Sequence, residues 1–189
     1  IRSSNGGSSP FTTDTYQLVT VLEQLQDKDQ IIIGVHRPDV MKIMGYYDES
    51  VSQNTIHAIA GKYSEDRIQV SANDEAIYTL HSTELNGARA FYIEDSIRYG
   101  GAYLVASGGQ TKNRLALWDK LYDDKTYGNY GYWDITIASD GEATVKNLGN
   151  SAGKYLQYNA SNNPTLFACY ADLSQTPVCI YRRVEALGD

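Results

Sequence analysis

The sequence predicts an all-β protein in which a pattern of four short strands occurs three times. Three observations support this: one stretch repeats without a gap at a constant spacing, apolar residues alternate at period two, and turn signals separate the alternating runs. Such alternation places one face of each strand against a core. Helical periodicity is confined to one segment near the start of the chain.

The clearest repeat relates GGAYLVASGGQTKNRLALWDKL (100–121) to AGKYLQYNASNNPTLFACYADL (152–173), 52 residues later. Tyr103 falls on Tyr155, Leu117 on Cys169 and Trp118 on Tyr170. AFYIED and EATVKN continue the same spacing upstream. The strands before these, IYTLH and YWDITI, correspond at a spacing of 55 residues. The spacing differs because the first copy turns through TELNG and the second through the tighter SDG. Self-similarity at a fixed spacing indicates a repeat architecture.

A third, more divergent copy is expected in the N-terminal part at shifts near 60. YQLVTV opens it, and DQIIIGV, VMKIMG and TIHAIAG follow. VCIYRRV near the end repeats the first-strand type and could pair with the N-terminal strand. The copies cover about 16–70, 76–121 and 132–184. Together they indicate a β-trefoil, since closure buries a shared core and removes exposed strand edges. Another closed β-barrel or a β-sandwich is the alternative.

The length of 189 residues suits one well-buried core. We therefore expect a flexible Gly/Ser-rich tether at 1–11 and a single domain at 12–189. Within it, Leu18, Val21, Leu22 and Leu25 have helical spacing, which predicts a short helix or helical turn between 18 and 30.

The amino-acid composition limits the kinds of partner and the location that we expect for the protein. The net charge is −7 and the basic residues are scattered, which disfavours nucleic-acid binding. No apolar run approaches the roughly 20 residues that span a bilayer. Sixteen tyrosines against three phenylalanines are typical of extracellular β-proteins, because tyrosine tolerates a wet surface at one end. We expect a monomer that is secreted or anchored to the outer membrane, on its extracellular face.

The two cysteines leave alternatives open. A hairpin centred on Ser174 could bring Cys169 and Cys179 opposite one another, so a disulfide is geometrically conceivable. Alternation assigns them to opposite faces, and the match of Cys169 with Leu117 favours a small core hydrophobe.

Two resemblances follow from these segments. The threefold pattern is similar to ricin-type and other β-trefoil domains, although their Q-x-W signature and paired cysteines are absent. More specifically, YQLVTVLEQLQDKDQIIIG and GKYLQYN…LFACY…VCIYRR resemble a repeat domain of secreted and cell-surface proteins of gut Bacteroidetes. The resemblance covers nearly the whole chain after Phe11. It implies an extracellular, non-catalytic accessory module and carries over no site residue.

The sequence contains no catalytic motif of the G-x-S-x-G, H-E-x-x-H, Walker or Rossmann type. His36, His57 and His81 come from different strands or loops without ligand-like spacing. We expect no enzymatic activity, no catalytic residue, no metal and no cofactor.

The candidate site is the long loop YDDKTYGNYGYW, residues 122–133. Rigid aromatic faces beside Asn and Asp can stack against sugar rings or form a protein-binding surface. The alternative is that some of these tyrosines close the end of the barrel. The segment MGYYDES (44–50) has the same ambiguity, and Tyr158 with the turn NASNNP stays a candidate because neither has a counterpart in the other copy. The residues predicted to bind ligand are Tyr122, Asp123, Asp124, Tyr127, Asn129 and Tyr130.

The expected partner is a glycan or a protein ligand at the cell surface, with a glycan as the first choice. The alternatives are a protein-ligand binder such as a protease inhibitor, or a hydrolase whose site no motif reveals. Inhibition predicts a stoichiometric complex with a protease, and hydrolysis predicts turnover.

Overall fold

A computed structural model of the chain describes residues 13–47, 55–72, 74, 76–96, 101–107, 113–122 and 128–184, without the side chain of Tyr46. They form one 15-stranded antiparallel sheet and a single 3-10 turn, η1 (Leu22–Gln24). The strands are β1 (Thr13–Leu18), β2 (Asp29–Gly34), β3 (Lys42–Tyr47), β4 (Ile56–Ala60), β5 (Lys62–Ser64), β6 (Arg67–Ser71), β7 (Tyr78–Leu85), β8 (Ala88–Asp95), β9 (Ala102–Val105), β10 (Ala116–Trp118), β11 (Trp133–Ile137), β12 (Glu142–Asn147), β13 (Tyr155–Asn159), β14 (Leu166–Tyr170) and β15 (Thr176–Val184).

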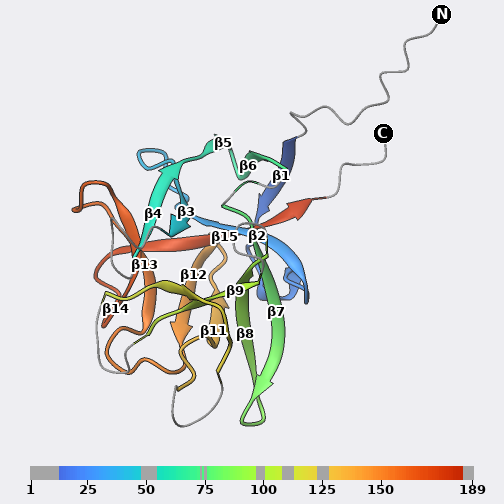
Figure 1. Cartoon of the computed structure of the whole chain (residues 1–189). Coiled ribbons are helices and arrows are strands. Elements are labelled where there is room, and N and C mark those ends of the chain that lie inside the picture. Colours follow the sequence, from blue (N-terminus) through green and yellow to red (C-terminus); the bar gives the residue numbers. More distant parts are fainter. Residues whose placement is uncertain are drawn as a thin grey trace, which may run out of the picture.

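The sheet closes on itself as a barrel of ten strands (Figure 1). One closed circuit of pairings within it runs from β2 through β7, β8, β11, β12 and β15 back to β2. The expectation of an all-β protein with a closed barrel is confirmed. Closure satisfies backbone groups that an open sheet would leave at its edges.

A hairpin is inserted between successive strands of this circuit at three places. β3–β4 lies between β2 and β7, β9–β10 between β8 and β11, and β13–β14 between β12 and β15. The last two hairpins pair in the same register, with Tyr103 opposite Trp118 and Tyr155 opposite Tyr170. The 52-residue spacing seen in the sequence is therefore kept in the strand pairing.

The tight turns follow local chemistry. β7 and β8 are joined by Asn86 and Gly87, both with positive φ (52° and 81°), as a two-residue hairpin turn requires. This turn is shorter than the expected TELNG, because β7 continues through Leu85. Between β11 and β12, the side chain of Asp140 accepts a hydrogen bond from the backbone N–H of Glu142, at 2.9 Å.

The N-terminal part differs from expectation. β1, expected to open the first copy, lies outside the ten-strand barrel and pairs with β15 and β6. Its pairing with β15 is the one that the sequence indicated. The chain stays extended beyond Leu18 because the N–H of Val19 bonds to the carbonyl of Ile180, at 2.8 Å, so only the turn η1 forms where helical spacing was seen.

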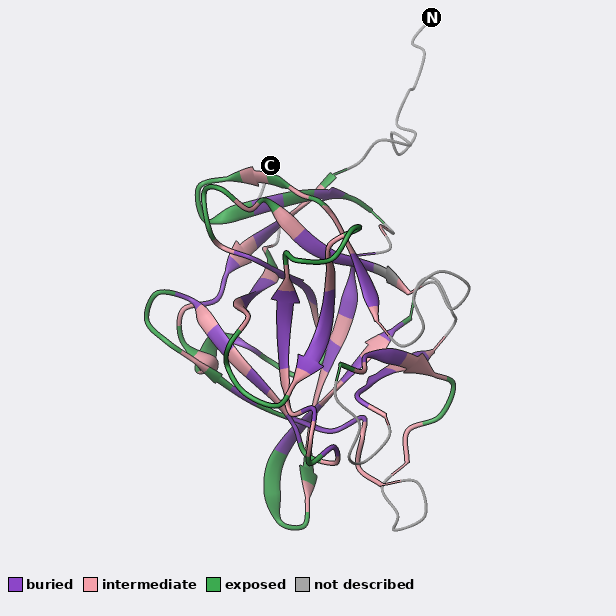
Figure 2. Cartoon of the chain, turned by 90° about the vertical axis from the view of Figure 1, so that its left-hand side faces the viewer, coloured by how far each residue is buried: buried purple, intermediate pink, exposed green. Residues whose placement is uncertain are grey.

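Two apolar clusters hold the sheet together. The larger contains Ile31, Ile33 and Trp133, and the smaller contains Ile32 with Tyr181. β2 is thus buried on both faces, which accounts for its continuous apolar run. Burial is concentrated in the barrel strands, and the exposed residues gather at the turns (Figure 2).

The cysteines are separate free thiols. Cys169 lies in the larger cluster and Cys179 in the smaller, both buried. The interpretation of Cys169 as a core hydrophobe is confirmed, and the opposite-face assignment explains why no disulfide joins the pair. Among the described residues, no helix is long and apolar enough to cross a membrane.

Candidate functional site

Two of the predicted ligand-binding residues meet on one tryptophan. The rings of Tyr122 and Tyr130 each lie 6.0 Å from the ring of Trp118, at 80° and 84°, so both contact it edge to face. All three side chains are half-buried. Asp123, Asp124 and Tyr127 lie outside the described residues. The structure therefore brings the two ends of the predicted loop together around Trp118.

The C-terminal end of this loop is fixed by backbone hydrogen bonds. The carbonyl of Tyr130 accepts from the N–H of Ala106 at 2.9 Å and from the side-chain amide of Asn147 at 2.7 Å. Asn147 is itself buried, and its Oδ1 accepts from the N–H groups of Gly149 and Asn150. The position of the Tyr130 ring is thus set by the sheet.

Asn129 is half-buried, like Tyr130 beside it. Its side-chain oxygen is buried and accepts no hydrogen bond within the described part of the chain. Its backbone carbonyl accepts the N–H of Tyr132, at 3.2 Å.

The aromatic cluster continues across four strands. Trp118 on β10 stands opposite Tyr103 on β9, and directly opposed side chains share one face of a sheet. The ring of Tyr92 on β8 lies 5.9 Å from that of Tyr103. On β7, His81 stacks on Tyr92 at 4.5 Å with an interplanar angle of 7°. We call this surface the aromatic band; its members are His81, Tyr92, Tyr103, Trp118, Tyr122 and Tyr130.

The band has a polar edge on β8. Glu94 Oε1 lies 3.1 Å from Nε2 of His81, and both side chains are partly exposed. Burial, and next the neighbouring Tyr103, raises the pKa of the Tyr92 phenol, so this ring is neutral at neutral pH. The band thus combines uncharged aromatic faces with one carboxylate and one imidazole.

Sequence reasoning missed most of the band. Because Tyr103 and Trp118 recur as Tyr155 and Tyr170 in the other copy, the repeat indicates a structural role for them and does not single them out as ligand-binding residues. Alternation could have found Tyr92, because it lies between the buried residues Phe91 and Ile93 and therefore faces outward.

Two other predicted candidates lie in other parts of the fold. Tyr158 is only 3% exposed and packs on Phe167, with ring centroids 5.3 Å apart, so its interpretation as a free functional residue is wrong. In the segment MGYYDES, Met44 is fully buried, and residues 48–50 lie outside the described residues.

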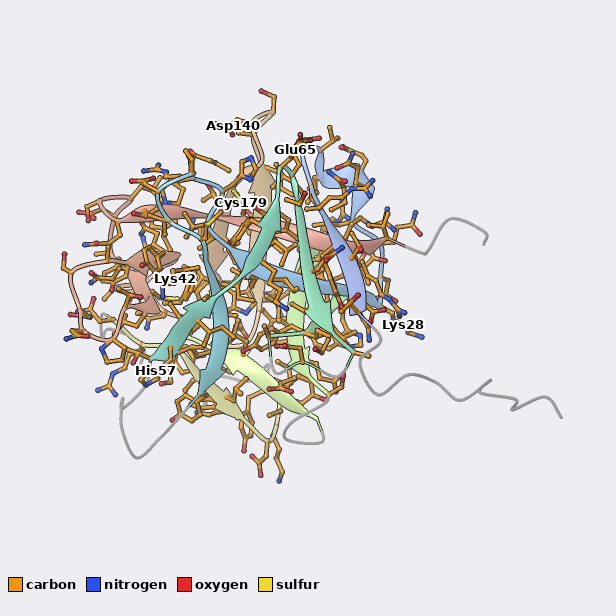
Figure 3. The ribbon with its side chains drawn as sticks, turned by 90° about the horizontal axis from the view of Figure 1, so that it is seen from above. Lys28, Lys42, His57, Glu65, Asp140 and Cys179 are labelled. Carbon is orange, nitrogen blue, oxygen red and sulfur yellow. The ribbon has the colours of Figure 1, made fainter. Side chains whose placement is uncertain are left out.

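A cavity lies elsewhere, between the β2–β3 loop and the β5–β6 hairpin, and neither was singled out from the sequence. Its volume is about 280 Å³. Figure 3 shows Glu65, one of its residues, at the tip of this hairpin. The lining residues are His36, Arg37, Pro38, Met41, Tyr63, Glu65 and Asp66.

Two contacts fix the walls of this cavity to one another. Nε2 of His36 lies 3.2 Å from Oδ1 of Asp66, and the hydroxyl of Tyr63 donates to the carbonyl of Lys42, at 2.9 Å. Nδ1 of His36 lies 2.9 Å from the buried hydroxyl of Tyr181, so both ring nitrogens of His36 have a polar partner.

The described residues contain no cluster of three or more His, Cys, Asp or Glu side chains that could hold a metal ion. Cys169 and Cys179 also lack the properties of reactive cysteines, which are exposed and readily form thiolates. Burial raises the pKa of both thiols, that of Cys179 to about 12.

Comparison with known proteins identifies a similar fold but no family. No family model matches the chain. No curated protein matches it. Among solved structures, one described as "BEL beta-trefoil apo crystal form 3" superposes with a TM-score of 0.54 over 85% of this chain and 96% of that chain. The fold is β-trefoil-like. At 10% sequence identity the likeness concerns the fold alone.

Proposed function

We propose that the protein is a non-catalytic binding module that binds glycans through the aromatic band. The observation that supports this best is the continuous run of partly exposed rings from His81 to Trp118. Aromatic faces bind the apolar C–H faces of sugar rings, and the carboxylate of Glu94 can accept hydrogen bonds from sugar hydroxyls.

The dimensions of the band favour an oligosaccharide over a single sugar. Neighbouring strands lie about 4.8 Å apart, so four strands span roughly 14 Å between the outermost rings. The loop residues Tyr122 and Tyr130 extend the surface beyond β10. A ligand that follows the band therefore crosses the strands instead of running along one of them.

Two finer features belong to the same proposal. The domain consists of three diverged copies of a four-stranded unit, which the shared register of the β9–β10 and β13–β14 hairpins supports. The protein acts on the outside of a bacterial cell, secreted or surface-anchored. The abundance of tyrosine and the resemblance described above support this location.

The decisive variant is Trp118→Ala, and Tyr170→Ala is its matched control. The two residues occupy the same register position in sister hairpins, and both are half-buried. On a glycan array, Trp118→Ala should lower binding by about fivefold or more, since loss of one stacking ring costs roughly 1–3 kcal/mol. Tyr170→Ala should retain binding. Equal loss in both variants would contradict a site on the band.

Tryptophan fluorescence gives an independent measurement. The chain has two tryptophans, and Trp133 is fully buried with its Nε1–H donating to the carbonyl of Leu104, at 3.2 Å. A glycan on the band should therefore change the emission of Trp118. The change should vanish in Trp118→Phe. A signal that persists in this variant would place the ligand elsewhere.

A further inference from the structure

We propose that the cavity between the β2–β3 loop and the β5–β6 hairpin binds a primary alkylammonium group, the chemistry of a lysine side chain. The site is separate from the aromatic band and independent of glycan binding. We call it the amine pocket; it comprises the lining residues named above, His36 to Met41 on one wall and Tyr63 to Asp66 on the other.

Backbone hydrogen bonds hold the two walls of the amine pocket in place. In the β2–β3 loop, the N–H of Val40 bonds to the carbonyl of Arg37, at 3.0 Å, and Pro38 occupies the second position of this turn, where its fixed φ is favourable. The N–H of Gly61 bonds to the carbonyl of Met41 at 2.9 Å, which ties the loop to the start of the β5–β6 hairpin. A site formed in advance loses little entropy when a ligand binds.

The apolar part of the amine pocket suits a short hydrocarbon chain. Met41 is 50% exposed, and Pro38 is exposed beside it. The hydroxyl of Tyr63 is already used in its bond to Lys42, so this residue offers its ring to a ligand. A volume of about 280 Å³ accommodates a small ligand and lies just below the usual range for drug-sized molecules.

The charges of the amine pocket favour a cation. Arg37 is directed to Glu142, at 3.3 Å, so its charge is offset. Glu65 forms no hydrogen bond or ion pair within the described part of the chain. Of the two carboxylate oxygens of Asp66, Oδ1 lies beside His36, and the other oxygen can accept further bonds. A bound ammonium could therefore contact two carboxylates, and the protein's net charge of −7 would attract it at long range.

The experiment uses the full chain and blocked lysine (Nα-acetyl-lysine N-methylamide), followed by backbone amide NMR. Blocked lysine should shift the amides of Val40, Gly61 and Asp66 in a saturable manner. Blocked norleucine, which has the same four side-chain carbons without the ammonium group, and the anion hexanoate should not. Binding of norleucine with equal affinity, or of hexanoate in place of the amine, would overturn the proposal.

Two variants locate the charge. Glu65→Gln should weaken binding roughly tenfold, because it removes a charge-assisted hydrogen bond at nearly constant size. Glu84→Gln makes the same charge change on an exposed residue near the tip of the β7–β8 hairpin, which lies at the other end of the molecule from β5 and β6 (Figure 1), and should leave binding unchanged. Equal weakening in both variants would show that only the overall charge of the protein matters, and it would contradict the proposed binding site.

A last comparison identifies the source of the amine. n-Butylamine carries the lysine side chain alone, and a Gly-Gly-Lys-Gly-Gly peptide with blocked ends carries it within a backbone. Tighter binding of the peptide indicates a lysine of a protein partner, and equal binding indicates a free amine. Both results support the proposal, whereas absence of saturable binding by all three amines contradicts it.

Discussion

At the scale of single residues, the amine pocket depends on a close approach of backbone to side chain at Gly34. A Cβ at this position would lie 2.8 Å from the hydroxyl of Tyr63 and 3.1 Å from Cγ2 of Ile43. The absence of a side chain at Gly34 is what lets the Tyr63 hydroxyl reach the carbonyl of Lys42. The hydrogen bond that joins the two walls of the amine pocket therefore requires a glycine at position 34.

This contact predicts coupling between two substitutions. Gly34→Ala should lower the free energy of unfolding by about 1–3 kcal/mol through overpacking, and Tyr63→Phe by about 1 kcal/mol through the lost hydrogen bond. The double variant should lose less than the sum, by at least about 0.5 kcal/mol, because the hydroxyl that the new methyl group would strike is gone. Urea denaturation of the four proteins measures the cycle. Strict additivity would show that the two residues do not touch.

At the scale of elements, the β9–β10 and β13–β14 hairpins share a register but have different neighbours. The outer edge of β14 pairs with β4 at Leu166 and Phe167 and forms a bridge to Arg114 at Cys169, which is completely buried. β10 is the last strand in the sheet order, and its equivalent residue, Leu117, is half-buried. Trp118 and Tyr170 themselves are both half-buried, and what distinguishes Trp118 is its edge-to-face contact with the loop residues Tyr122 and Tyr130.

Reciprocal substitutions test this difference in surroundings. Cys169→Leu adds volume to a closed core and should lower the free energy of unfolding by about 1–3 kcal/mol. Leu117→Cys removes volume at a partly exposed position and should cost about 1 kcal/mol or less. The comparison is made by urea denaturation of both variants against the parent protein. A smaller loss for Cys169→Leu than for Leu117→Cys would mean that the neighbouring strand does not set the burial.

The same contrast explains how far the sequence could predict the site. The 52-residue spacing predicted that the two hairpins are equivalent, and the structure pairs their strands in the same register. The spacing could not show which hairpin has an open edge, since that depends on β4, far away in the sequence. The β5–β6 hairpin was missed for a related reason: its residues 62–71 have no counterpart in the other copies, and its contacts with β1 are long-range.

At the scale of the whole molecule, tyrosine and cysteine side chains are built into the barrel and its outer layer. β1 pairs with β15 on one edge and with β6 on the other. The smaller apolar cluster contains residues of these strands, including Tyr16, Tyr181 and Cys179. Burial raises the pKa of both tyrosines, and of Tyr63 beside them, well above the ordinary value near 10. The fold therefore depends on these hydroxyl and thiol groups remaining protonated.

Alkaline pH should accordingly unfold the protein through these groups. Because their folded-state pKa values lie above the unfolded ones, the unfolded chain ionises first, and stability is complete below about pH 8.5. Above that pH the free energy of unfolding should fall, first as the cysteines of the unfolded chain ionise and then its tyrosines. Each group contributes about 1.4 kcal/mol per pH unit until its folded-state pKa is reached, about 12 for Cys179. Urea midpoints between pH 7 and 11 measure the decline. Tyr181→Phe should begin less stable but decline less steeply, since one ionising group is removed. An unchanged slope in this variant would show that the buried phenol of Tyr181 does not contribute to the alkaline transition.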